Sequence, residues 1–311
     1  MRHILRSFSG VLLIAVSLSI LLSVTVYAQK PGDSGFLSLR MAVGARETGM
    51  GGSGVAATRG AAAIYWNPAA LAFSEYNTDL LLQHQGWLGL FHKETATMAH
   101  RTSFGDIGFF FSGFYSDAIE RYGEEPVGVP EGTFKPHDVV VGLSFARKVV
   151  ETVSAGVTVK MLYEKIDIYS DSGYAVDVFL FHQAVIEGLT FGASLTNLGS
   201  QLQLKDEPFD LPMAIRVGAA YDPQHPFLAG KLTFTGDLIM PNDGNDKAHV
   251  GAEYRMLTEL ALRVGTKVNY DSQGLTAGIG LRRGALGVGY SFEDMQNDLD
   301  PSHKFALELH Y

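Results

Sequence analysis

The stretch TVSAGVTVKMLYE, from Thr152 to Glu164, changes in polarity at almost every residue. Side chains of an extended strand point alternately to opposite faces, so a period of two indicates a β-strand and excludes a helix. The apolar set is Val153, Ala155, Val157, Val159, Met161 and Tyr163, and the set between them is Thr152, Ser154, Gly156, Thr158, Lys160, Leu162 and Glu164.

The same pattern returns along the chain from Thr78 onward, with a turn after each segment. A soluble β-sandwich also alternates, but its strands usually contain about five or six residues, whereas a tilted strand needs about ten to cross a bilayer. The length and even number of the segments predict an all-β fold, a fourteen-stranded antiparallel transmembrane β-barrel. The expected strands are 78–90, 93–103, 106–116, 137–149, 152–167, 173–183, 188–199, 212–222, 229–240, 247–256, 259–270, 274–283, 285–293 and 303–311.

Connection lengths predict the orientation of this barrel, because bacterial outer-membrane barrels have short periplasmic turns and longer extracellular loops. The long or charged connections all fall on one side and are 117–136, 200–211, 241–246 and 294–302. The expected periplasmic turns are Ser103 to Gly105, Val149 to Glu151, Ala184 to Glu187, Asp222 to Leu228, Met256 to Thr258, and Arg283 with Gly284.

A closed wall leaves no unpaired backbone in hydrocarbon and provides rigidity to a chain without cysteine. The apolar set then faces lipid, and charged side chains face the lumen. The expected lumen charges are Lys160, Glu164, Asp177, Arg216, Lys231, Asp237, Glu253, Arg255, Arg263, Lys267, Arg282 and Glu308. The expected interfacial aromatic residues are Trp87, Tyr163, Tyr221, Tyr254, Tyr270, Tyr290 and Tyr311.

Both chain ends indicate export to the outer membrane of a diderm bacterium. Residues 1–28 have a basic start, an apolar core and a Val26-Tyr27-Ala28 end, which is the pattern of a cleaved signal peptide. The chain ends on a strand that alternates apolar residues and closes with an aromatic. We expect outer-membrane lipid and the assembly machinery as partners, with the C-terminal assembly signal made of Phe305, Leu307, Leu309 and Tyr311.

Gly49, Gly51 and Gly54 have the G-x-G-x-x-G spacing of a dinucleotide-binding turn. That motif requires a buried strand before it and a helix after it, but no branched apolar run precedes it and Pro68 follows. Residues 29–77 are instead expected to form a hatch or plug segment inside the barrel at 78–311, since Gly49, Gly51, Gly52 and Gly54 allow close packing against the wall.

The sequence contains no pattern that predicts catalysis, cofactor binding or nucleic-acid binding. No G-x-S-x-G elbow occurs, no Cys/His metal spacing exists, and the acidic loop Asp294 to Asp300 lacks the glycine turn of a calcium site. A net charge of −9 argues against nucleic acid as a partner. We therefore expect a non-enzymatic protein with no cofactor and no bound metal.

The segments Arg46 to Ala56 and Ala61 to Ala72 resemble the N-terminal part of the PorV/PorQ family, within the FadL-like group of hatch-containing barrels. In that resemblance Asn67, Pro68 and Ala69 correspond to the hatch motif. It implies a role in type IX-like secretion, with cargo proteins and secretion components as partners. The alternative is FadL-like uptake of long-chain fatty acids or other hydrophobic molecules, although the aromatic run Phe109-Phe110-Phe111 with Phe114 and Tyr115 is expected to pack against lipid.

Overall fold

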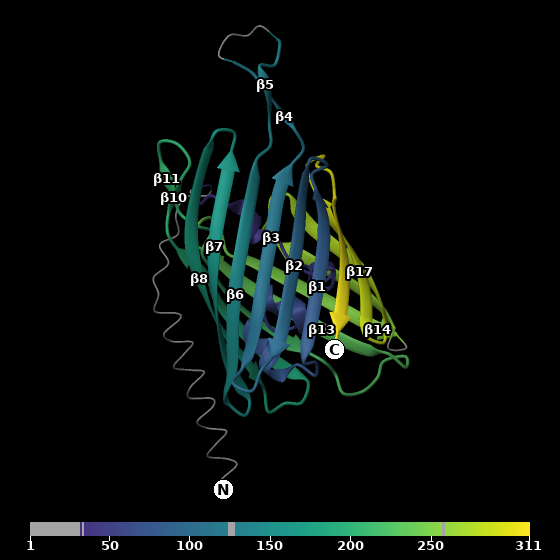
Figure 1. Cartoon of the computed structure of the whole chain (residues 1–311). Coiled ribbons are helices and arrows are strands. Elements are labelled where there is room, and N and C mark those ends of the chain that lie inside the picture. The colour runs from purple at the N-terminus through teal and green to yellow at the C-terminus, as the bar shows by residue number, and fades with distance from the viewer. Residues whose placement is uncertain (1–31, 33, 124–127, 257–258) are drawn as a thin grey trace.

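The computed structural model describes residue 32 and residues 34–123, 128–256 and 259–311. The predicted signal peptide at 1–28, and residues 257–258 of one expected turn, lie outside this part. Within it, fourteen strands close into one antiparallel barrel, in which each strand pairs with its neighbours in the sequence and β1 pairs with β18 (Figure 1). The predicted fold class is confirmed.

The barrel strands follow the segments predicted from the period of two, with ends that differ by a few residues. They are β1 (Thr78–Trp87), β2 (Phe91–Arg101), β3 (Asp106–Ser116), β6 (His137–Val150), β7 (Val153–Ile166), β8 (Tyr169–Gln183), β9 (Leu189–Gly199), β12 (Ala214–Tyr221), β13 (Lys231–Pro241), β14 (Lys247–Met256), β15 (Leu260–Val268), β16 (Gln273–Arg283), β17 (Leu286–Met295) and β18 (Ser302–His310).

Two features of the loops differ from the expectation. The long loops contain the small hairpins β4 (Ile119–Arg121) with β5 (Gly132–Phe134), and β10 (Leu202–Gln203) with β11 (Pro208–Phe209), whose strands are too short to show a period. β8 starts at Tyr169 rather than residue 173, because Asp167 adopts a φ of 55° and turns the chain at once. In Figure 1 the β4–β5 hairpin projects from the end of the barrel that carries the long loops.

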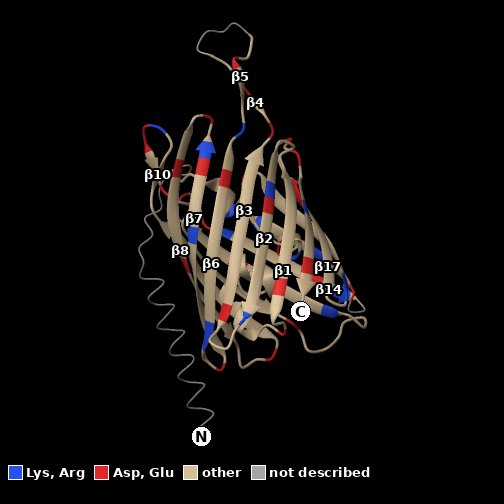
Figure 2. Ribbon diagram, viewed as in Figure 1, with Lys and Arg blue, Asp and Glu red and all other residues tan. Residues whose placement is uncertain are grey.

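The wall separates an outward apolar face from an inward polar face, as β7 shows. Val159 and Met161 are 53% and 71% exposed, whereas Thr158 and Lys160, which alternate with them, are buried. The outward apolar row from Val153 to Tyr163 covers about ten residue steps of ~3.3 Å at a tilt of about 40°, which gives ~25 Å of height. That height matches the apolar band of an outer-membrane barrel. Charged residues of the front wall are found mostly near the strand ends (Figure 2).

The N-terminal part of the described chain lies inside this barrel, where it is seen as short helices behind the strands of Figure 1. Residues 34–77 are named the lumen segment below. Its elements are η1 (Leu37–Arg40), α2 (Ala45–Gly49), η2 (Gly60–Ala62), α3 (Ala63–Trp66) and η3 (Pro68–Phe73). No helix in the described residues has the length and apolar character required to cross a membrane.

The predicted orientation can be tested with two single cysteines, since the chain has none of its own. Thr133 is exposed on the β4–β5 hairpin, and Ser103 is exposed in the turn between β2 and β3 at the opposite end. We expect a membrane-impermeant maleimide to label Thr133→Cys on intact cells, and Ser103→Cys only after the outer membrane is permeabilised. The reverse labelling pattern would show that the barrel is inverted.

Candidate functional site

The lumen segment is held in place by polar side chains that the wall directs at its backbone. Backbone groups in an irregular buried segment need partners, and inward Ser, Thr, Gln and Lys residues supply them. The bonds run from Gly44 N to Gln83 Oε1, 2.6 Å, from Thr97 Oγ1 to Ala61 O, 2.8 Å, from Ser154 Oγ to Ala69 O, 2.6 Å, and from Thr190 Oγ1 to Ala56 O, 3.0 Å. These contacts reach around the barrel, from β1 and β2 to β7 and β9.

The predicted glycines lie where the segment touches β14, β15 and β16. Gly51 has a φ of 76°, and a Cβ there would stand 2.7 Å from Val250 O. Its amide donates to Thr276 Oγ1 over 2.9 Å. A Cβ at Gly49 would stand 3.1 Å from the Cα of Gly278 in β16, which is a tight contact. Gly51 therefore needs glycine, and Gly49 allows a close approach, because backbone packs directly on backbone.

Gly52 and Gly54 follow Gly49 and Gly51 in the lumen segment and also make close contacts. Gly52 has a φ of 74°, and its carbonyl accepts hydrogen bonds from Arg216 Nη1 at 3.0 Å and from His249 Nδ1 at 2.8 Å. At Gly54 a Cβ would stand 2.4 Å from the Trp66 ring. All four predicted glycines thus lie in the contact between the lumen segment and the wall, or within the segment itself.

The wall has glycines of its own opposite the segment, and these were missed in the sequence analysis. A Cβ at Gly265 would be 2.1 Å from Gly51 N, one at Gly251 would be 2.3 Å from Met50 O, and one at Gly192 would be 2.1 Å from Val55 O. The available signal was glycine at inward positions of strands, which weakens a strand unless another backbone approaches closely.

Asn67, Pro68 and Ala69 lie together and join the segment to β7 and β8. The Asn67 side chain is fully buried and donates to Val55 O and Leu180 O, both at 2.9 Å. Its Oδ1 accepts from Ala69 N at 3.2 Å, which caps η3. Pro68 and Ala69 pack on Gly156 of β7. Asn67 therefore bonds to two parts of the segment and to the wall at once.

Charges also join the segment to the wall. Glu253 of β14 accepts hydrogen bonds from Arg46 Nε at 3.1 Å, Arg263 Nε at 2.7 Å and Arg255 Nη2 at 2.8 Å. Burial opposes the charge of Arg46, but Glu253 and Glu47 outweigh it and raise the pKa of Arg46. Burial raises the pKa of Glu47, whose Oε1 accepts from Thr58 Oγ1 at 3.0 Å.

The predicted lumen charges face inward, and several pair across neighbouring strands. Lys160 Nζ lies 2.8 Å from Asp177 Oδ1, and Arg216 Nη1 lies 3.1 Å from Asp237 Oδ2. Lys93 and Lys304 were not among the predicted lumen charges, yet each is only 1% exposed. Lys93 Nζ donates to Ser38 O and Met41 O, at 2.9 and 3.0 Å, and Lys304 Nζ donates to Thr48 Oγ1 at 2.9 Å.

A cavity of about 710 Å³ lies between the lumen segment and the end of the wall that carries the long loops. Phe36, Tyr65 and Trp66 of the segment line one side of it. Burial raises the pKa of Tyr65 to about 12, so its phenol is neutral, and its hydroxyl donates to Leu39 O at 3.0 Å. Inward charged residues, among them Asp138 and Glu164, form a polar sector of the same cavity.

An aromatic cluster lines the wall of this cavity and corrects two expectations. Trp87, Phe91 and Phe114 have ring centroids 5.3–6.0 Å apart and face inward, so Trp87 does not belong to an interfacial girdle. Tyr270 also lines the cavity, where its hydroxyl lies 2.8 Å from His249 Nε2. Both residues were expected on the outside because aromatic residues near strand ends usually lie at a membrane interface.

The aromatic run of β3 divides between the two faces of the wall, which corrects a third expectation. Phe109, Phe111 and Tyr115 are exposed on the outside, where lipid contact was expected for all five residues. Phe110 is buried, and both Phe110 and Phe114 line the cavity.

The proposed assembly signal lies on the outward face of the last strand. Phe305 and Leu307 are exposed, and Leu309 shares their face of β18. Tyr311 N donates to Thr78 O and its carbonyl accepts from Asn77 N, both at 2.8 Å, so the C-terminus is tied to the start of β1. These four residues stay a predicted assembly signal.

Loss of the Asn67 side chain should loosen the lumen segment. Asn67→Ala removes partners from two buried carbonyls and one amide, at about 1–3 kcal/mol for each group left unpaired. The chain has two tryptophans, so a Trp87→Phe background makes Trp66 the single reporter of the segment. We expect a red shift of Trp66 emission and raised conductance in planar bilayers. Asn77→Ala, at an exposed residue of the same segment, is the control and should change neither.

Bulk at Gly265 should displace the segment from β14 and β15. Gly265→Val places side-chain atoms where Gly51 N now lies, and overpacking of this kind costs ~1–3 kcal/mol or more. The Trp66 signal should then be lost at lower urea concentration, while the circular dichroism of the barrel persists. Gly236→Val is the matched control, since a Cβ there has its nearest neighbour at 3.6 Å. Equal urea midpoints for the two variants would contradict the close packing of the lumen segment against the wall at Gly265.

Comparison with solved structures places this architecture among known barrels, although no family model matches the chain and no curated protein matches it. The Pseudomonas putida toluene transporter TodX aligns with a TM-score of 0.61 at 12% identity, over 91% of this chain and 98% of its own. The CymD monoaromatic hydrocarbon channel aligns at 0.57 and 14%, over 87% and 98%. A Pseudomonas aeruginosa FadL homologue aligns at 0.57 and 10%, also over 87% and 98%. The chain therefore has the fold of FadL-like outer-membrane barrels.

Proposed function

We propose that this protein is a non-enzymatic outer-membrane channel that takes up a hydrophobic molecule from the cell exterior. The observation that carries the proposal is the aromatic-walled cavity of about 710 Å³ at the extracellular end of the lumen. Cavities of roughly 300–1,000 Å³ with apolar walls and a few polar groups suit a small ligand. The solved structures of this fold include a toluene transporter and a monoaromatic hydrocarbon channel, which supports the same class of cargo.

The position of the cavity suits capture from outside. Trp87 ends β1, Phe91 begins β2 and Phe114 lies near the end of β3, so the aromatic cluster lies beside the extracellular loops. Burial of a hydrophobic ligand on these rings is favourable at about 25 cal/mol for each Å² removed from water. The polar sector around Asp138 and Lys160 offers hydrogen bonds to any polar end of the molecule.

Onward passage requires the lumen segment to move, because it fills the barrel below the cavity. Met50, Val55 and Ala63 of the segment are completely buried, as are Ser53 and Asn67. We propose that the segment is the hatch of the channel, and that the contacts of Asn67 and of Arg46 with Glu253 hold it closed.

The secretion hypothesis has less support than uptake. It rests on the resemblance of residues of about 40–75 to PorV/PorQ proteins, and those residues are the ones that fill the lumen here. In the described part of the chain the β4–β5 hairpin projects farthest from the barrel and could meet a cargo protein, whereas the internal cavity is suited to a small molecule. We therefore place uptake of a hydrophobic molecule first.

Direct binding tests this function. The detergent-purified protein is titrated with toluene and with oleate, and the affinities are compared with those of a Phe91→Ala/Phe114→Ala variant. Removal of two rings from the cavity wall should weaken binding of the preferred probe by about tenfold or more, given ~1.5–3 kcal/mol for each fully buried ring. Phe109→Ala removes an outward ring from β3, the strand that also carries Phe114. This variant should bind the probe as the parent protein does.

Two results would contradict the proposal. One is that neither probe binds. The other is that a secreted protein co-purifies in stoichiometric amount while the cavity variant behaves as the parent, which would return the assignment to secretion.

A further inference from the structure

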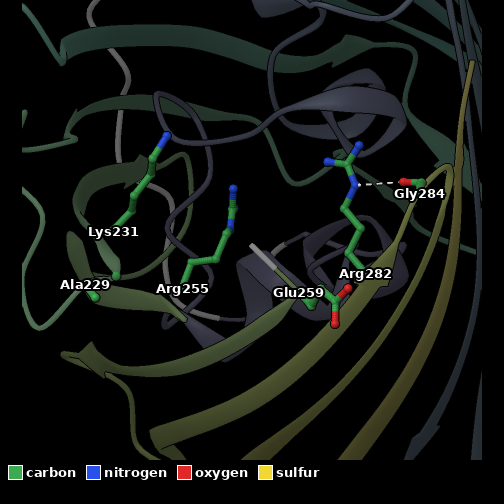
Figure 3. A pocket seen from close by; sticks show the side chains of 7 residues that line it. Ala229, Lys231, Arg255, Glu259, Arg282 and Gly284 are labelled. Carbon is green, nitrogen blue, oxygen red and sulfur yellow. Dashed lines mark hydrogen bonds between the residues drawn. The ribbon is translucent and has the colours of Figure 1, made fainter. Parts of the chain in front are cut away.

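A second, smaller pocket lies at the opposite end of the lumen, among the ends of β13, β14 and β16. Its volume is about 400 Å³. Its charged lining residues are Lys231, Arg255, Glu259 and Arg282, all at positions that face inward (Figure 3). In that view the ends of Lys231, Arg255 and Arg282 point the same way, while the Glu259 carboxylate lies apart from them near the base of Arg282. This group is named the periplasmic pocket.

The cations of the periplasmic pocket exceed its anions. Arg255 Nη2 bonds to Glu253 Oε1 at 2.8 Å, but that carboxylate also receives Arg46 and Arg263. Arg282 Nε donates to Gly284 O at 3.3 Å, and its Nη2 donates to the Tyr76 hydroxyl, so both of its partners are neutral. Among the described residues, neither Lys231 nor Glu259 has a salt-bridge partner. Positive charge therefore remains unbalanced in a protein whose net charge is −9.

The surroundings also separate this pocket from a simple cluster of surface lysines. Lys231 and Arg255 are direct partners in the register of β13 and β14, so two cations are held side by side by the sheet. Like charges directly opposite each other are unfavourable unless an anion joins them. Gly284 also lies in the lining, and a Cβ there would have no neighbour within 4 Å, so this side of the pocket is open.

We propose that the periplasmic pocket binds a phosphate group. A tetrahedral phosphate carries several acceptor oxygens and up to two charges, so it can accept from Lys231, Arg255 and Arg282 together, whereas a carboxylate has two oxygens in one plane. The phosphate belongs either to a small soluble ester or ion in the periplasm, or to the head group of a phospholipid from the inner leaflet. This site is distinct from the aromatic cavity and does not depend on its ligand.

Calorimetry on the full-length protein in a phosphate-free, non-ionic detergent tests the proposal. One titration uses inorganic phosphate, a second uses a monomeric short-chain phosphatidic acid, and a third uses acetate at equal ionic strength. We expect a saturable phosphate signal and weaker acetate binding. Lys231→Gln should raise the dissociation constant for phosphate about tenfold, which is the range for one charged hydrogen bond. Arg282→Gln should have a similar effect.

The matched control is Arg283→Gln, which changes the net charge equally at an exposed neighbour that faces the other side of β16. It should leave the dissociation constant unchanged, and heat-modifiable migration on gels verifies that each variant is folded. Binding of inorganic phosphate identifies a soluble source, and binding of the phosphatidic acid alone identifies a lipid head group. Absence of both signals, equal affinity for acetate, or equal binding by Lys231→Gln and the parent would each overturn the proposal.

Discussion

The whole structure depends on the requirement that backbone hydrogen bonds be satisfied away from water. In hydrocarbon each N–H and C=O must pair within the protein, so a sheet is stable there only if its last strand meets its first. Pairing of β1 with β18 meets this requirement, from Asp79 with His310 to Gly86 with His303. The alternation of apolar and polar side chains follows from the same closure, because one face of the wall meets lipid and the other meets the lumen.

The same requirement governs the lumen segment, whose backbone is irregular and buried. Its short helices leave many carbonyls and amides without internal partners. Inward hydroxyl and ammonium groups of the wall supply these partners. Thr97, Ser154 and Lys93 each donate a hydrogen bond to a carbonyl of the segment. Where side chains would prevent contact, the wall has glycine instead, as at Gly251 and Gly265. Polar positions and glycines of the barrel are therefore adapted to the segment as much as to water.

The sequence contained enough information for the wall but not for what lies inside it. The period of two in a stretch such as Thr152 to Glu164 depends only on local chain geometry, so strands and their faces could be predicted. The partners of Lys93 and Glu253 depend on which strands meet in space, at separations of up to about two hundred residues, and no local pattern records this. Trp87 and Tyr270 were wrongly placed because an aromatic residue near a strand end suits both a membrane interface and a lumen.

The location of the aromatic cavity follows from how the barrel is filled. Fourteen strands enclose more space than inward side chains alone occupy, since eight strands already leave room only for side chains. The lumen segment fills part of this space, and small residues such as Gly51 and Ala69 let it lie against the wall. At the end of the barrel that carries the long loops, residues 36–41 of the segment line the cavity, and the rings of Trp87, Phe91 and Phe114 face the same open space. The cavity at that end is therefore a consequence of where the segment packs tightly against the wall and where it does not.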